Sequence, residues 1–379
     1  MNTGNDTDEH ISALIHLLKN SGAMLSSKIV TAGFDGFIDT IVKAIRDKQP
    51  EQPPALFNTI KEFGAYITAK DGSSFSLELE ERNIKAGGNM PIMANALGHL
   101  GVVVNCIGAL GHPQIHPAFK TLSPNCNIYS FADPGTSTAI EFQDGKMILG
   151  LMDSLHRADW DTIKNTIGLE VLVNLFKASD LLCLVNWAEI DASTDIWKGI
   201  MKDVFPHYTK DDKTPIIFVD LSDFSKRDNK AVMEVLQLLK ELTNYGKLII
   251  GLNKNEAKLI YTALFQKPPG DELESLGSPI FDELKPTTLV LHSPKQAIAI
   301  DNSGLFACNS FFVADPKIST GAGDNFNAGF CAAQLLNASA ALSIVFANAV
   351  SALYVRNGIS PQLNDVAGFL ENQLIVNKG

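Results

Sequence analysis

Short apolar runs alternate with helical patterns along the second half of the chain, from residue 169 onward. The runs are continuously apolar, which is typical of strands buried on both faces of a parallel sheet. They lie at 181–185, 216–220, 248–252 and 288–291, and the polar residues at their ends are Asn186, Asp220, Asn253 and His292. The pattern predicts βαβ units around a parallel sheet, with a ligand at the carboxyl ends of its strands.

Several local patterns predict further elements. We expect three helices: an amphipathic one at 7–20 capped by Thr7, one near 57–63, and an Ala-rich last helix at 338–356. We expect a first strand at 28–34, an alternating strand at 74–80, and a hairpin at 136–152 that turns at 143–146. A further apolar stretch, at 311–313, has β character.

A glycine-rich turn at 319–329 reads Ser-Thr-Gly-Ala-Gly-Asp-Asn-Phe-Asn-Ala-Gly and leads into an Ala-rich helical run. The free N–H groups at a helix start attract anions, and the small residues Gly321, Ala322 and Gly323 let a phosphate approach the backbone. Asp324 adds a carboxylate that could accept a proton from a hydroxyl attacking phosphorus. An ordinary helix start with an acidic first turn is the alternative. The dinucleotide fingerprint and the Walker A loop are both excluded, because residue 326 is Phe and no Gly-Lys-Ser/Thr is present.

A second glycine-rich stretch, at 86–101, begins with Ala-Gly-Gly-Asn. Gly87 and Gly88 would let a polyol reach bare amides, and Asn89 offers a donor and an acceptor to hydroxyls. The alternative is a glycine-rich helix entry.

Acidic residues follow the first strand and a later one. Asp35 and Asp39 lie where open α/β sheets bind ligands, although each could instead serve an acidic turn or a helix cap. Glu256 follows Asn253 by three residues and could hold a water molecule of a hydrated magnesium ion. A capping box between Asn253 and Glu256 is an equally good explanation.

Composition narrows the class of protein. A hydrophobic content of 45%, with 19% charged residues, is ordinary for a soluble enzyme, and the net charge of −11 argues against a nucleic-acid surface. Five scattered cysteines without Cys-x-x-Cys spacing predict neither disulfides nor zinc. We find no leader sequence and no apolar stretch of membrane-spanning length, so we expect a cytoplasmic protein.

Together, the stretches at 319–329 and 86–101 resemble the two signatures of the PfkB carbohydrate kinases, in the ribokinase-like superfamily, and the resemblance runs from about residue 28 to the C-terminus. It implies a three-layer α/β fold in one domain, 1–379, with a mainly parallel sheet and a small β lid from insertions near 40–86 and 136–152. It also implies ATP- and Mg²⁺-dependent phosphorylation of a sugar-like hydroxyl compound, with a possible homodimer formed through the lid.

The resemblance assigns roles to the candidate residues. Asp324 would be the base, with the amides of Gly321, Ala322 and Gly323 as the anion hole. Gly87, Gly88, Asn89 and either Asp35 or Asp39 would bind the sugar. The nucleotide would contact Asn253, Thr320, Gly321, Gly323 and Asn348, and Glu256 would hold magnesium through water.

Two positions depart from the family pattern. The turn His-Ser-Pro-Lys at 292–295 replaces a Thr followed by a glycine-containing turn, and Ile318 stands where an Asp is frequent. Two alternatives therefore stay open: an ADP-dependent sugar kinase of the same superfamily, and a non-catalytic sugar- or nucleotide-binding regulator.

Overall fold

A nine-stranded sheet forms the centre of the protein in the computed structural model, which describes residues 3–19 and 21–378. The strand order is β14-β13-β12-β11-β10-β9-β1-β5-β6, and the pairs from β6 to β12 are parallel. The bounds are β1 Ile29–Phe34, β5 Val103–Gly108, β6 Cys126–Ser130, β9 Leu181–Leu184, β10 Ile216–Asp220, β11 Lys247–Asn253, β12 Thr288–His292, β13 Gln296–Asp301 and β14 Gly304–Asn309. The predicted parallel strands are thereby confirmed.

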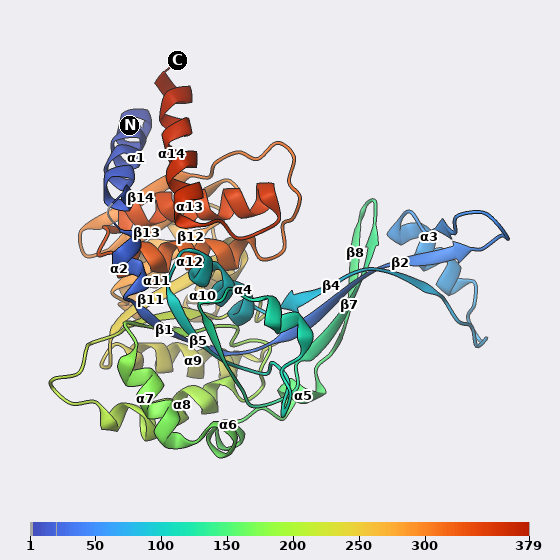
Figure 1. Cartoon of the computed structure of the whole chain (residues 1–379), viewed down its shortest axis with the longest axis horizontal. Coiled ribbons are helices and arrows are strands. Elements are labelled where there is room, and N and C mark those ends of the chain that lie inside the picture. Colours follow the sequence, from blue (N-terminus) through green and yellow to red (C-terminus); the bar gives the residue numbers. More distant parts are fainter. Residues whose placement is uncertain (1–2, 20, 379) are drawn as a thin grey trace.

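Helices cover both faces of this sheet (Figure 1). On one side lie α1 Thr3–Lys19, α2 Gly22–Ser26, α4 Asn89–His99, α12 Ala322–Leu335, α13 Ala340–Asn357 and α14 Leu363–Lys378. On the other lie α6 Trp160–Ile167, α7 Leu169–Ala178, α8 Ser193–Asp203, α9 Asn229–Leu242, α10 Lys254–Phe265 and α11 Leu273–Leu284. Alternate side chains of β9 enter the two cores, Cys183 facing one and Leu184 the other. The predicted three-layer α/β arrangement is therefore confirmed.

A smaller sheet projects from this body as an arm (Figure 1). Its strands are β2 Phe37–Asp47, β3 Ala55–Leu56, β4 Leu79–Gly87, β7 Gly135–Phe142 and β8 Gly145–Leu151, in the order β3-β2-β7-β8 with β4 also paired to β2. Helix α3, Ile60–Thr68, covers its outer end, where Val42, Ile140, Phe57 and Phe63 form a separate core. We call this sheet with α3 the lid.

Only Asp35 and Gly36 separate β1 of the body from β2 of the lid. Gly36 is tightly enclosed, since a Cβ there would lie 2.2 Å from the carbonyl oxygen of Ala109. The junction therefore accepts only glycine.

Some predicted elements differ from the structure. The alternating segment 74–80 is irregular up to Glu78, because Phe75 packs on the ring of Tyr66 and the pairing of β4 begins only at Leu79. Helix α3 begins three residues later than predicted, at Ile60, because Thr59 caps it by accepting the N–H of Glu62 at 3.1 Å.

Further differences lie near the two ends of the chain. Helix α1 begins at Thr3, so Thr7 lies inside it and is not its cap; Asn20, the predicted end, lies outside the described residues. The stretch 311–313 is not a strand: Phe311 packs edge-on against Phe369 at 5.1 Å, and Phe312 is exposed. That packing partner belongs to α14, a helix beyond the predicted last one.

Helix α13 is long and apolar enough to cross a membrane, alone among helices of the described residues. It lies in the body, with 72% of its length buried there. Packing against α12 and the sheet accounts for its composition.

Candidate active site

The polar ends of the parallel strands meet the start of α12 at one edge of the sheet. Asp35 follows β1, Asp220 ends β10, Asn253 ends β11 and His292 ends β12. Asp324 enters the same region from α12, since the charges of both Asp220 and Asp35 act on it. The acids Asp35, Asp220 and Asp324 therefore lie at the carboxyl edge of the sheet, where the sequence predicted a ligand.

The glycine turn at 319–323 forms the start of α12. Gly321 adopts a left-handed conformation, with φ of 87°, and a Cβ there would lie 2.8 Å from the hydroxyl of Tyr354. That hydroxyl donates to the carbonyl of Thr320 at 2.9 Å and so fixes the turn from α13. The N–H of Gly323 has no acceptor among the described residues, and this amide, at the positive end of the helix dipole, is available to an anion.

Asp324 lies in the first turn of α12 and is half-buried. Burial raises its pKa well above the ordinary value, and the negative charges of Asp220 and Asp35 raise it further. It forms no ion pair within the described part of the chain. A carboxylate that binds a proton more readily than usual suits the role of general base.

Asp220 and Glu256 form a second pair of buried acids facing Asp324. Burial raises the pKa of Asp220 to about 6, although its carboxylate accepts the backbone N–H of Ser222 and the side-chain amide of Asn327, both at 2.7 Å. Burial also raises the pKa of Glu256, together with the charges of Asp220, Asp223 and Asp324. Mutual repulsion of this kind favours a bound cation.

Asn253 and Glu256 form a capping box at the start of α10, which explains the position of Asn253 and of one oxygen of Glu256. The side chain of Asn253 accepts the N–H of Asn255 at 2.9 Å and of Glu256 at 3.0 Å, while Glu256 accepts the backbone N–H of Asn253 at 2.8 Å. No group of three or more His, Cys, Asp or Glu side chains within residues 3–19 and 21–378 has the arrangement of a metal site. Asp220 and Glu256 are the carboxylates at this edge that could hold a hydrated magnesium ion through water.

Asp35 is completely buried and engaged at the start of α4. Its carboxylate accepts the backbone N–H groups of Asn89 at 2.8 Å and Met90 at 2.9 Å, and the side-chain amide of Asn186 at 2.6 Å. Burial raises its pKa to about 6, against the opposing effect of these bonds. Asp35, which follows β1, therefore links the start of α4 to the segment that follows β9.

Asp39 lies on β2 of the lid and is more accessible. Its carboxylate accepts one side-chain hydrogen bond from the described residues, from the hydroxyl of Ser137 at 2.7 Å. The two glycines fit these two acids closely: a Cβ at Gly87 would lie 2.5 Å from Asp39 and one at Gly88 2.5 Å from Asp35. Asp39 thus keeps oxygen lone pairs that a substrate hydroxyl could use.

The remaining candidates lie apart or make other contacts. Asn348 is buried on α13 and donates to the carbonyl of Asn309 at 3.4 Å; within the described part of the chain it makes no hydrogen bond to the acidic residues. His292 lies against Gly323, where a Cβ would be 3.3 Å from its ring, and burial lowers its pKa to about 4. The imidazole is therefore neutral at physiological pH.

Three residues that hydrogen-bond to the candidate site had no predicted role. Asn186 binds Asp35, Ser137 binds Asp39, and Tyr354 binds the carbonyl of Thr320. For Asn186 a signal existed, because it is a polar residue at the end of a buried strand. The bond of Ser137 to Asp39 spans 98 residues, and that of Tyr354 to Thr320 spans 34, so neither could be found from local sequence.

Solved structures with this fold include ribokinases. Arabidopsis thaliana ribokinase, complexed with ribose and ATP, is 17% identical with a TM-score of 0.61, and the match covers 91% of this chain and 98% of that one. A putative ribokinase II from E. coli, in complex with ATP and Mg²⁺, is 15% identical with a TM-score of 0.60, covering 91% and 99%. The fold is ribokinase-like.

A relative by sequence is the ketohexokinase of Haloferax volcanii, 26% identical over 347 residues that cover 91% of each chain. Fold, site and relative together define a carbohydrate kinase, a phosphotransferase that acts on a sugar. Within that class the chain belongs to the prokaryotic ketohexokinase family, whose model it matches over residues 5–373.

Proposed function

We propose that the protein transfers the terminal phosphoryl group of ATP to a hydroxyl of a ketohexose, with magnesium, and that Asp324 is the general base. The observation that carries the proposal is the position of Asp324: a proton-accepting carboxylate in the first turn of α12, beside an unpaired backbone amide. The name of the Haloferax volcanii relative supports a ketohexose as acceptor, and the ATP in the two ribokinase structures supports ATP as donor.

In the proposed reaction the acceptor O–H bond breaks and its proton moves to Asp324. A new O–P bond forms as the bond between the terminal phosphorus and the bridging oxygen breaks, and ADP leaves. The amides of Gly321, Ala322 and Gly323 stabilise negative charge on the transferred group. Thr320 also borders this phosphate site. Asp39, with Gly87, Gly88 and Asn89, binds the sugar, while Asp35 holds the first turn of α4 in place.

Magnesium would be held through water by Glu256 and Asp220 and would neutralise charge on the nucleotide phosphates. Asn253 orients Glu256 through the capping box. Asn348 would border the nucleotide from α13. We propose that residues 1–379 work as one kinase domain, in the cytoplasm, and that neither nucleic acid nor a membrane is a partner.

We further propose a homodimer formed through the lid. The edge strand β8 exposes Ile148, Leu149 and Leu151 at 58%, 55% and 64%, and Ile84 of β4 is 46% exposed. Exposed apolar side chains on a sheet edge favour association. Light scattering of wild type and Leu149→Glu tests this, since the substitution should give a monomer.

The test of function is nucleotide consumption by purified protein with magnesium, either ATP or ADP, and a panel of ketohexoses, aldoses, pentoses and nucleosides. We expect turnover with ATP and a ketohexose, and a loss of at least about a hundredfold in kcat for Asp324→Asn. Asp315→Asn, an exposed acid of the preceding loop, is the matched control. Equal turnover by wild type and Asp324→Asn would remove Asp324 from the mechanism.

A further inference from the structure

The buried acids at the carboxyl edge of the sheet have no basic partners among the described residues. None of the ion pairs between described residues includes Asp35, Asp220, Glu256 or Asp324. Transfer of a phosphoryl group spreads negative charge over its oxygen atoms, and backbone amides supply only partial positive charge. A side-chain cation close to the glycine turn would therefore have a large effect.

Lys146 of the lid meets that requirement. Its ammonium group donates to the hydroxyl of Thr320 at 2.7 Å, and Thr320 immediately precedes the left-handed Gly321. Lys146 forms no ion pair within the part of the chain that the structure describes. Its positive charge thus lies at the entrance of the glycine turn, and its partner is a neutral hydroxyl that an anion could replace.

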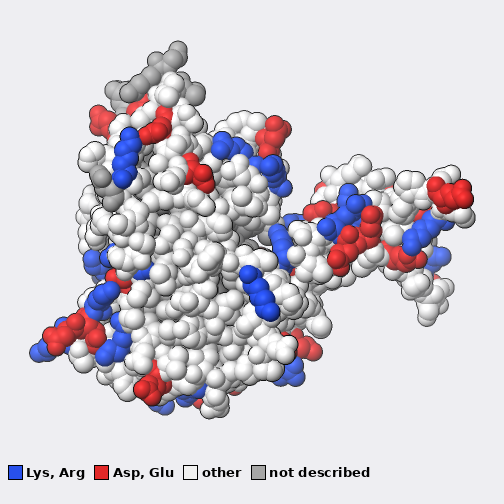
Figure 2. All heavy atoms as spheres, in the orientation of Figure 1, with Lys and Arg blue, Asp and Glu red and all other residues white. Residues whose placement is uncertain are grey.

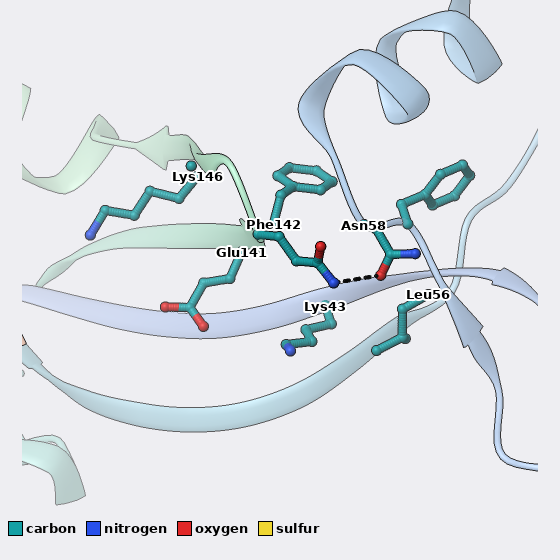
Figure 3. A pocket seen from close by; sticks show the side chains of 9 residues that line it. Lys43, Leu56, Asn58, Glu141, Phe142 and Lys146 are labelled. Carbon is teal, nitrogen blue, oxygen red and sulfur yellow. Dashed lines mark hydrogen bonds between the residues drawn. The ribbon is translucent and has the colours of Figure 1, made fainter. Parts of the chain in front are cut away.

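The lid holds Lys146 in this position by fixing the hairpin from which it extends. In the turn of the hairpin, the N–H of Gln143 donates to the carbonyl of Asn58 at 2.8 Å, and Asp144 accepts the N–H of Ile60 at 2.9 Å. Figure 3 shows the side-chain bond between Gln143 and Asn58, with Lys146 extending away from Phe142 and Asn58. The backbone of Lys146 is therefore anchored to the segment before α3.

The strand register places Lys146 on the face of the lid that carries Asp39. Ser137, the partner of Asp39, lies opposite Gly150, and Lys146 lies opposite Glu141. Positions 146, 148 and 150 share one face because side chains alternate along a strand. Lys146 also lines a cavity of about 390 Å³ with Lys43 and Glu141 (Figure 3).

We infer that Lys146 is a catalytic residue whose ammonium group contacts the transferred phosphoryl group when nucleotide and sugar are bound. The inference rests on the proposed function. A lysine is a compact charge on a flexible stem, so a short movement from the hydroxyl of Thr320 brings it to a phosphate oxygen at the same turn. The lid would then supply both a sugar ligand, Asp39, and a charge for the transition state.

The test compares Lys146→Met, Lys146→Arg and a matched control, Lys43→Met. Lys43 lines the same cavity as Lys146, but only Lys146 donates to the hydroxyl of Thr320 among the described residues. For Lys146→Met we expect kcat to fall by about tenfold to a hundredfold with little change in the KM of the sugar. Lys146→Arg should restore most of the activity, and Lys43→Met should behave as wild type.

A second measurement does not depend on turnover. Thermal unfolding is followed with Mg²⁺, ADP and fructose, with and without aluminium fluoride, a planar mimic of the transferred group. Wild type should gain stability from aluminium fluoride, and Lys146→Met should lose most of that gain while keeping the response to ADP.

Each other outcome overturns a distinct claim. Wild-type kinetics and a wild-type fluoride response in Lys146→Met would remove Lys146 from the site and leave the proposed function intact. A loss of activity that Lys146→Arg does not restore would show a structural role. A wild-type protein inert with every donor and acceptor would overturn the proposed function itself, and this inference with it.

Discussion

The body and the lid hold their functional acids in opposite ways. In the body, Asp35 and Asp220 are buried, their carboxylates accept three and two hydrogen bonds, and burial raises the pKa of each to about 6. In the lid, Asp39 accepts one bond, from Ser137, and remains accessible. Charged side chains cover much of the arm, whereas the view of the body in Figure 2 is mostly uncharged. Under the proposed function, the body would hold the phosphate and the magnesium ion with fixed groups, and the lid would present accessible ligands to the sugar.

The largest effect expected from this comparison is that of Gly88→Ala. Gly88 and Gly72 both have positive φ, 96° and 73°, but a Cβ at Gly88 would meet the carboxylate of Asp35 at 2.5 Å, whereas one at Gly72, in the lid, would have no described atom within 4 Å. Gly72→Ala should therefore cost only about 1 kcal/mol of backbone strain. Gly88→Ala should abolish most activity and lower the unfolding midpoint much further. Similar midpoints and rates in the two variants would show that Asp35 is not tightly held.

Substituting Asp35, which follows β1, and Asp39, on β2, should separate their roles. Asp39→Ala should raise the KM of the sugar by about 10–100-fold, because a charged hydrogen bond to substrate is lost, and should leave the unfolding midpoint unchanged. Asp35→Ala should instead lower the midpoint, since the amides of Asn89 and Met90 lose their acceptor. Steady-state kinetics and thermal unfolding of both variants test this. A raised KM in Asp35→Ala alone would exchange the two assignments.

Removing a buried charge from the body should change how stability depends on pH. The pKa of Asp220 rises from 3.8 to about 6 on folding, so the folded state binds its proton more tightly. Stability should therefore fall as pH rises from about 4 to about 6, by up to about 3 kcal/mol from this group. Asp220→Asn should lose less stability than wild type between pH 4.5 and 7.5, as urea unfolding can measure.

The substituted residue can keep its hydrogen bonds, because the free carbonyl oxygen of Asn327 can accept the new amide. Parallel pH curves for the two proteins would contradict a buried, charged Asp220.

The smallest effect on activity is expected within the lid core. Phe63→Ala should weaken the local packing with Phe57 and Phe142 by about 3–5 kcal/mol without changing the unfolding midpoint of the body. Amide exchange should accelerate in α3 and β8 only. Phe75→Ala, which removes a 41% exposed ring from the same region, is the control. Faster exchange in the body strands would show that the two cores are one unit.

The body could be predicted from the sequence better than the lid, for a physical reason. Its strands are continuous apolar runs buried on both faces, and each ends at a polar residue, so local pattern and tertiary environment agree. In the lid, α3 begins three residues late and 74–78 is irregular, because a small core with many exposed positions leaves more than one way to pack.

In the candidate site, too, features that depend on local sequence could be predicted, and features that depend on distant contacts could not. The glycine turn, Asp324 and the Asn253–Glu256 box lie within single short segments, and the structure shows each as a local unit at a helix start. Which acid each glycine faces depends on contacts across the chain, such as Asn186 with Asp35, 151 residues apart. Local sequence left Asp35 and Asp39 equivalent, and only the fold distinguishes their surroundings.

The closely packed Gly36 has a consequence for how the lid would move. A Cβ at Gly36 would overlap the carbonyl of Ala109, so this joint is tightly enclosed, and we expect the first residues of β2, including Asp39, to move with the body. The register shift between Ile41 and Val42 is the next place where β2 can flex. We therefore expect the inner part of β2, which carries Asp39, to be fixed before the sugar binds, while the outer part of the lid keeps enough freedom for Lys146 to make its short movement from Thr320 to the phosphoryl group. In kinetic terms, sugar affinity should be nearly independent of that movement.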